Sequence, residues 1–215
     1  MAVKAHEVAL KHLSSADPVL KGLIDRASDR AALTLLVDPD YKPELEPYAS
    51  LIRAIVGQQL SVAVARSMWN RLLEFFGGAP PTPEQLLAID IDELRAAAGL
   101  SGAKARSLKS LAEHVRDGQL ELDRLDQLDD ATIESELIAV KGIGPWTAHM
   151  FLMSQLGRPD VLAPGDLGIK RGIELAYGLK ELPSPAEVER LAEPWRPWRS
   201  VACRVLWASL EFEPV

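Results

Sequence analysis

The sequence predicts an all-α fold, and three features carry this prediction. Apolar residues recur at the spacing of one helix face, as at Leu45, Tyr48, Leu51, Ile52 and Ile55. Capping residues and helix breakers separate such segments, and no pair of alternating apolar runs predicts a β-hairpin. With 215 residues, 47% of them hydrophobic, the chain is long enough for a sizeable core.

Capping signals divide the first half of the chain into helices. Asp17 and Pro18 supply an N-cap and a first-turn proline, and Ser61 is an N-cap of the same kind. The short apolar run 34–37 has no strand partner, so we interpret it as a packed loop or a short helix. The expected helices are residues 2–13, 18–27, 43–57 and 62–76, two short helices after Thr82 and Asp90, and residues 102–116.

The second half contains the most unusual run of the sequence, residues 137–171. An apolar helical segment breaks at the glycines of Lys141-Gly142-Ile143-Gly144, and a new helix begins at Pro145. A short apolar connection then leads to Pro164-Gly165-Asp166, where another helix begins. The helices expected here begin after Asp129 or Asp130, at Pro145, after Asp166, after Ser184 and at Arg199, the last one ending near residue 212.

The glycine break has a chemical meaning. Gly142 and Gly144 permit a close approach to the main chain, and Pro145 suits the first turn of a helix. Amide N–H groups at such a helix start point outward and attract anions, a nucleic-acid phosphate among them. A lone pair of glycines at this spacing is, however, more typical of an ordinary corner between two helices.

Composition limits the classes of function. The single cysteine, Cys203, excludes an internal disulfide and a four-cysteine zinc or iron–sulfur site. No apolar run is long enough to span a membrane and no cleavable leader opens the sequence, so we expect a cytoplasmic protein, nucleoid-associated in a bacterium. A net charge of −7 argues against strong nucleic-acid binding, but Lys104, Arg106 and Lys109 could form a modest basic face.

Residues 140–148 resemble the hairpin of the helix-hairpin-helix DNA glycosylases, and residues 162–171 resemble the segment with that superfamily's catalytic aspartate. From about residue 43 to 207 the chain is most similar to the 3-methyladenine DNA glycosylase II (AlkA-type) branch. The resemblance implies two helical subdomains with the active site in the cleft between them. Residues 1–48 and 164–215 would form the terminal subdomain and residues 49–163 the central six-helix subdomain, in a compact form without an N-terminal β domain.

The resemblance implies a base-excision-repair glycosylase that hydrolyses the N-glycosidic bond of 3-methyladenine or 7-methylguanine type bases. Its partner would be double-stranded DNA containing damaged bases, with no membrane partner, and we expect a monomer. Bond cleavage leaves an oxocarbenium-like sugar, which a fixed carboxylate stabilises. Asp166 is the catalytic candidate, although aspartate before a helix often serves only as a cap. An alkylated purine is already a cationic leaving group, so no general acid is needed.

The resemblance also assigns further residues. A base pocket would contain Trp146, Met150, Leu167 and Trp207, where an indole ring can stack on a cationic base. Gln59 and Leu60 would fill the gap left by the extruded nucleotide. The hairpin would bind DNA phosphate through the amides of Gly142, Gly144 and Thr147. No cofactor is required, but relatives bind Na⁺ or K⁺ through main-chain carbonyls, which would be those of Ile138, Val140 and Ile143.

Two alternatives remain open at this point. The chain could be a non-catalytic helix-hairpin-helix DNA-binding protein, or a glycosylase for oxidised or mismatched bases. Strand-cutting members carry a nucleophilic lysine two residues after the second hairpin glycine. Trp146 occupies that position here, so the resemblance predicts hydrolysis alone and an abasic product.

Overall fold

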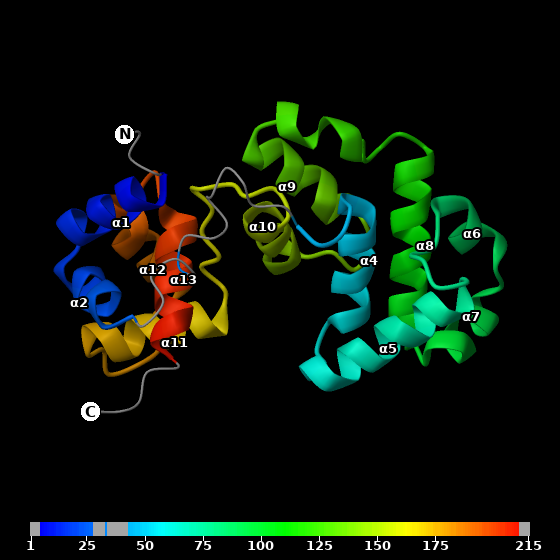
Figure 1. Cartoon of the computed structure of the whole chain (residues 1–215), viewed down its shortest axis with the longest axis horizontal. Helices are drawn as coiled ribbons and strands as arrows, with labels where there is room; N and C mark the ends of the chain where they lie inside the picture. Colours follow the sequence, from blue (N-terminus) through cyan, green and yellow to red (C-terminus); the bar gives the residue numbers. More distant parts are fainter. Residues whose placement is uncertain (1–4, 28–32, 34–42, 211–215) are drawn as a thin grey trace. The chain divides into compact units, whose positions relative to one another are not determined.

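The computed structural model describes residues 5–27, 33 and 43–210, and every regular element within them is a helix (Figure 1). The expected run 34–37 lies outside the described residues. The helices are α1 (Ala5–Ala16), α2 (Pro18–Arg26), α4 (Pro47–Gly57), α5 (Val62–Phe75), α6 (Pro83–Ala88), α7 (Ile91–Ala98), α8 (Gly102–Arg116), η2 (Leu122–Gln127), α9 (Asp130–Ala139), α10 (Pro145–Ser154), α11 (Leu167–Tyr177), α12 (Pro185–Ala192), η3 (Glu193–Trp195) and α13 (Arg199–Ser209).

The caps read from the sequence begin the helices as expected. The side chains of Asp17, Ser61 and Asp129 accept hydrogen bonds from the first free amides of α2, α5 and α9. Thr82 with Gln85, and Ser184 with Glu187, form reciprocal capping boxes at α6 and α12. These local signals therefore set most helix starts.

Some of the elements differ from the expectation. The helix expected from Pro43 begins at Pro47, because Glu46 is extended (φ −61°, ψ 154°), as a residue before proline prefers. The last helix ends at Ser209 rather than near 212. The two 3-10 segments η2 and η3 were not expected, and neither has a side-chain cap to mark its start.

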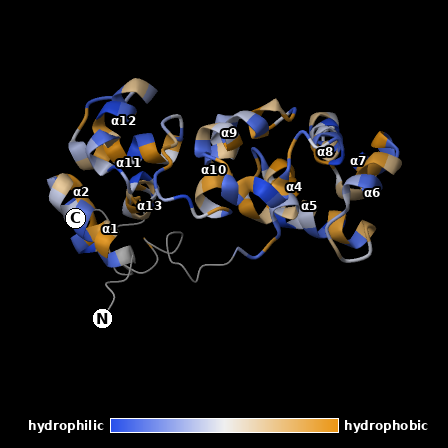
Figure 2. Ribbon diagram, turned by 90° about the horizontal axis from the view of Figure 1, so that it is seen from above, coloured by the Kyte–Doolittle hydropathy of each residue, from blue (hydrophilic) through white to orange (hydrophobic). Residues whose placement is uncertain are grey.

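The chain forms two compact units, Met1–Lys42 with Leu152–Val215 and Pro43–Phe151. The sequence predicts the junctions at 48/49 and 163/164. In the structure the chain passes from the second unit to the first within α10. Figure 2 shows that the helices of each unit carry both hydrophilic and hydrophobic residues, which is the pattern of helices that bury one face.

Helix α8 is central to the Pro43–Phe151 unit. It packs against α4, α6 and α7, while α5 packs against α4 and α7 (Figure 1). Ala105, Leu108 and Leu111 of α8 are fully buried, and their spacing places them on one face of the helix. Hydrogen bonds from two lysines of α8 add to this packing. Lys104 Nζ donates to the Val56 carbonyl at 2.8 Å, and Lys109 Nζ donates to the Leu87 carbonyl at 3.1 Å.

The other unit is built on α1, α2, α11 and α13, with η3 packed against α1 and α12. Trp195 of η3 is fully buried, and its Nε1 donates to Asp17 Oδ2 at 2.9 Å. The hydroxyl of Tyr177 at the end of α11 donates to the same carboxylate oxygen. Asp17 therefore caps α2 and also holds α11 and η3 to it.

Candidate active site

Asp166 is the N-cap of α11. Its Oδ1 accepts the Ile169 amide N–H at 2.8 Å and the indole N–H of Trp207, from α13, also at 2.8 Å. The Asp166 amide in turn donates to the Ala163 carbonyl at 3.0 Å, which closes the turn before the helix. Two donors on one oxygen fix the orientation of the carboxylate, and one of them comes from a second helix. Asp166 therefore caps α11, and its carboxylate is also held in the fixed orientation that a chemical role requires.

Gly168 makes the space that this arrangement needs. A Cβ atom at this position would lie 2.9 Å from Cδ1 and 3.0 Å from Nε1 of the Trp207 ring, and 3.1 Å from Asp166 Oδ1. Any side chain here would displace the indole or the carboxylate. The absence of a side chain at position 168 is therefore a condition for the Trp207–Asp166 hydrogen bond.

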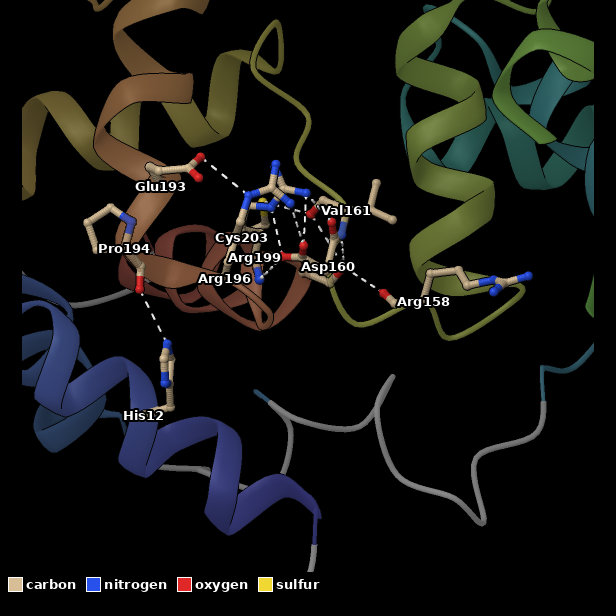
Figure 3. Close-up of polar contacts among 10 residues, drawn as sticks. His12, Arg158, Asp160, Val161, Glu193, Pro194, Arg196, Arg199 and Cys203 are labelled. Atoms are coloured by element: carbon tan, nitrogen blue, oxygen red, sulfur yellow. Dashed lines mark hydrogen bonds and ion pairs between the residues drawn. The ribbon is translucent and has the colours of Figure 1, made fainter. Parts of the chain in front are cut away.

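The segment leading to Asp166 is anchored to the start of α13 (Figure 3). Asp160 Oδ1 accepts from Arg199 Nε at 2.7 Å, and Asp160 Oδ2 accepts from Arg196 Nη1 at 2.7 Å. The hydroxyl of Ser200, which is 1% exposed, donates to the Arg158 carbonyl at 2.6 Å and accepts the Val161 amide at 3.0 Å. These contacts hold the chain between α10 and α11 in place just before the catalytic candidate.

The hairpin between α9 and α10 has the tight geometry that the glycines predict. Gly142 has φ +89°, and a Cβ atom there would lie 2.0 Å from the hydroxyl oxygen of Ser107 on α8. The next serine of that face, Ser110, accepts the Lys141 amide at 3.2 Å. Around Gly144, by contrast, nothing lies within 4 Å of an added Cβ. The hairpin is therefore held against α8 on the Gly142 side.

Of the four residues expected to contact the base, two lie at the starts of helices and two lie further along theirs. Trp146, in the first turn of α10, is 50% exposed, and Leu167, the first residue of α11, is 67% exposed. Met150 and Trp207 are partly buried. Thr147 is buried, at 5% exposure, and its side chain packs into the Pro43–Phe151 unit rather than outward. The exposed faces of Trp146 and Leu167 are available for contact with a ligand.

The turn of residues 57–61 between α4 and α5, here called the wedge turn, contains a strained residue. Gln59 has φ +57°, the one positive φ at a non-glycine position among the described residues. Its side chain is exposed, as is that of Leu60. The neighbouring Gln58 is partly buried and contacts the hairpin. Its Nε2 donates to the Gly142 carbonyl at 2.9 Å and to Thr147 Oγ1 at 3.3 Å.

Three residues of this site escaped the sequence analysis, namely Gln58, Ser107 and Ser110. Each of them contacts the hairpin from a position far away in the sequence, and no local sequence pattern predicts such a contact.

The expected basic face on α8 is also different from the prediction. Lys104 and Lys109 donate to main-chain carbonyls at the ends of α4 and α6, and burial lowers the pKa of Lys104. Their charges serve the fold of this unit.

The residues proposed for a cation lie at the start of the hairpin. Val140 and Ile143 have buried side chains, whereas that of Ile138 is 39% exposed. The Val140 carbonyl already accepts the Ile143 amide at 3.0 Å, and a carbonyl oxygen has a second lone pair for a cation.

Within the described residues, no three His, Cys, Asp or Glu side chains gather as metal ligands. No helix among the described residues is long and apolar enough to span a bilayer.

Comparison with known proteins places this geometry in a family. Residues 52–197 match the HhH-GPD superfamily base excision DNA repair protein family. The chain is 32% identical over 208 residues to DNA-3-methyladenine glycosylase 1 of Schizosaccharomyces pombe, covering 95% of this chain and 91% of that protein. It is 32% identical over 172 residues to DNA-3-methyladenine glycosylase 2 of Escherichia coli, covering 76% of this chain and 57% of that protein.

A solved structure agrees with the sequence relatives. The S. pombe 3-methyladenine DNA glycosylase (Mag1), in complex with abasic DNA, superposes with a TM-score of 0.79 at 33% identity, covering 93% of this chain and 94% of that one. The helical fold, the glycine hairpin and the capping aspartate thus occur together with a family match over most of the sequence. The chain belongs to the HhH-GPD superfamily of base excision DNA repair proteins.

Proposed function

We propose that this protein is a base-excision-repair DNA glycosylase that hydrolyses the N-glycosidic bond of alkylated purines, such as 3-methyladenine and 7-methylguanine, in duplex DNA. Membership of the superfamily and similarity to DNA-3-methyladenine glycosylases along nearly the whole chain support this. The single observation that carries it is the Asp166 carboxylate, held at the start of α11 by two hydrogen bonds to one oxygen. Such a fixed anion suits a reaction that develops positive charge on a sugar.

In the proposed mechanism, Asp166 acts on the sugar of the extruded nucleotide. As the N-glycosidic bond breaks, positive charge builds up on the anomeric carbon and the ring oxygen, and the carboxylate stabilises this charge. The same carboxylate orients the water that attacks the anomeric carbon. The bond electrons leave with the base, which neutralises its positive charge. The water oxygen becomes the anomeric hydroxyl of the abasic product, and the proton it loses passes to the Asp166 carboxylate and from there to solvent. The hydrogen bonds from Ile169 and Trp207 keep the carboxylate in one orientation throughout.

The alkylated base is recognised by its charge. Methylation at a purine ring nitrogen makes the base a cation, and a cation over an indole ring gains about 0.5–2 kcal/mol. The half-exposed indole of Trp146 supports this role, as does the exposed side chain of Leu167 beside Asp166. The other residues proposed to contact the base are Met150, on α10 of the Pro43–Phe151 unit, and Trp207, on α13 of the other unit. Trp207 would therefore both border the base and hold the catalytic carboxylate.

The Pro43–Phe151 unit carries the groups proposed to hold DNA. The amides of Gly142, Gly144 and Thr147, at the hairpin and the first turn of α10, would bind one phosphate, since the first amides of a helix have no partner within it. Gln59, or Leu60 beside it, would fill the space left by the extruded nucleotide. A monovalent cation at the carbonyls of Ile138, Val140 and Ile143 would steady the same hairpin.

We also propose that the enzyme has no lyase activity and is of the glycosylase II type. Trp146 stands where a Schiff-base nucleophile would have to be, and an indole cannot form that adduct. The product should therefore be an intact strand with an abasic site. Strand cleavage should appear only after separate alkali or heat treatment.

Base release from methylated duplex DNA tests the proposal, with Asp166→Asn as the key variant. Asparagine caps helices as well as aspartate does, and its Oδ1 can accept the same two hydrogen bonds, so the substitution removes charge and keeps the fold. We expect release of 3-methyladenine by the wild type and a loss of about 10²–10⁴-fold in Asp166→Asn. Asp123→Asn, at an exposed position of η2, is the matched control. Equal rates for wild type and Asp166→Asn would mean that Asp166 is only a cap.

A further inference from the structure

The wedge turn and the hairpin are joined by one side chain. Helix α4 ends at Gly57, the Leu60 amide returns to the Gly57 carbonyl at 3.3 Å, and Ser61 caps α5. Within this short turn Gln58 and Gln59 face different surroundings. Gln59 is exposed in a left-handed conformation, whereas the partly buried Gln58 reaches the hairpin, 84 residues further along the chain.

Both hydrogens of the Gln58 carboxamide are used in this contact. The nitrogen donates to the Gly142 carbonyl at 2.9 Å and to Thr147 Oγ1 at 3.3 Å. A carbonyl oxygen can only accept, so the amide nitrogen and not its oxygen must face Gly142. The two acceptors bracket the hairpin, one in its turn and one in the first turn of α10. One glutamine thus ties the hairpin turn and the first turn of α10 to the wedge turn.

Helix α8 contacts both the wedge turn and the hairpin. Lys104 donates to the Val56 carbonyl, two residues before Gln58, while Ser107 contacts Gly142 and Ser110 accepts the Lys141 amide. Three residues on successive turns of one helix therefore hold the wedge turn and the hairpin. Each of these contacts lies within the Pro43–Phe151 unit.

We propose that Gln58 is a positioning residue that sets the spacing between the phosphate held by the hairpin and the base step entered by Gln59. This rests on the proposed function. A wedge helps to extrude a base only if the backbone is held at a fixed distance from it, because a free turn would retreat from the stack instead of opening it. The strained φ of Gln59 also needs surrounding contacts to maintain it, and Gln58 supplies them from the next position.

The test separates base extrusion from bond cleavage. Gln58→Leu keeps most of the side-chain volume but removes both donors. Single-turnover base release is measured on two duplexes, one with the methylated base paired and one with it opposite an abasic-site analogue, where extrusion is easier. We expect Gln58→Leu to lose about ten- to hundredfold on the paired duplex and several-fold less on the unpaired one. Gln119→Leu, at an exposed turn of the same unit, should match the wild type on both.

Fluorescence of 2-aminopurine beside the lesion reports unstacking directly and should show slower opening in Gln58→Leu. If Gln58→Leu melts below the assay temperature, Gln58→Glu carries the test, because it keeps the length of the side chain and presents an acceptor to the Gly142 carbonyl. Thr147→Val should give a smaller defect of the same kind, and the double variant should lose less than the product of the two single losses.

Two failures remain distinguishable. A wild-type protein that releases no base from either duplex would contradict the proposed function. If the wild type is active but the Gln58 variants release base at the wild-type rate, this inference is wrong and the proposed function stands. The same holds if the variants lose equal activity on the paired and unpaired duplexes.

Discussion

The indole Nε1 of Trp207 donates a hydrogen bond to Oδ1 of Asp166 at 2.8 Å. The two residues are 41 positions apart, and the contact joins α13 to the cap of α11. The Ile169 amide donates to the same oxygen, so the carboxylate is fixed by its own helix and by a neighbouring one. A cap needs only the first of these bonds. The second therefore points to a requirement for orientation beyond capping.

The substitution Trp207→Phe tests that requirement. Phenylalanine keeps an aromatic ring in place but cannot donate to Asp166. A hydrogen bond to a charged group is worth about 1.5–3 kcal/mol, so we expect single-turnover base release to fall by about 10- to 100-fold. The same change at Trp69, a buried residue of α5, is the control and should leave the rate within about twofold. A Trp207→Phe rate equal to the wild type would show that the hydrogen bond has no part in catalysis.

Gly168→Ala should harm activity more than stability. Its Cβ would lie 2.9 Å from the Trp207 ring and 3.1 Å from Asp166 Oδ1, so one of the two side chains must move. Alanine also favours the helical conformation by about 0.5–1 kcal/mol, which offsets part of the clash in the free energy of unfolding. We expect a rate at least about tenfold lower, with a melting temperature within a few degrees of the wild type.

Gly22→Ala is the matched control for that experiment. Gly22 lies in the exposed interior of α2, and nothing is within 4 Å of an added Cβ. It should stabilise the protein by about 0.5–1 kcal/mol in denaturant unfolding without altering base release. If Gly168→Ala behaves like Gly22→Ala in both measurements, the close packing around Asp166 is not needed for the reaction.

The two hairpin glycines should respond differently to alanine. Gly142 has φ +89°, and an added Cβ would lie 2.0 Å from the Ser107 hydroxyl, so Gly142→Ala should destabilise the protein by about 2 kcal/mol or more. Gly144→Ala meets no atom within 4 Å and should fold normally. Its methyl group would lie at the proposed phosphate site, so we expect weaker DNA binding at unchanged melting temperature. Fluorescence anisotropy with duplex DNA measures this, and unaltered affinity would contradict a phosphate contact at Gly144.

Helix starts were the most predictable part of the fold. Asp17, Ser61 and Asp129 cap the helices assigned to them, because a cap depends only on a side chain and the few amides that follow it. The helix start predicted at Pro43 was wrong because two prolines in this segment carry the same local signal. Both Pro43 and Pro47 can start a helix, and Pro47 prevails because Glu46 before it is extended.

The contacts that hold the site together could not be read in this way. Gln58 looks like an ordinary turn residue until Gly142 lies beside it, and Lys109 looks like a solvated charge until the end of α6 lies within its reach. Asp166 was found through its resemblance to a family segment, but that resemblance did not show that Trp207 holds it. Local patterns specify elements, whereas tertiary partners depend on how the elements pack.

The buried thiol of Cys203 should make the free energy of unfolding depend on pH in the alkaline range. The thiol is fully buried in α13, and burial raises its pKa to about 12, well above the ordinary value for a cysteine. Below pH 9 both the native and the unfolded thiol are protonated, and the full stabilisation is present. As pH rises from 9 toward 12 the unfolded thiol ionises while the native one does not, so stability falls by up to about 1.4 kcal/mol per pH unit. Denaturant unfolding of wild type and Cys203→Ala at pH 8 and pH 10 measures this. The wild type should lose more stability than the variant, whereas equal losses would mean that the native thiol ionises in place.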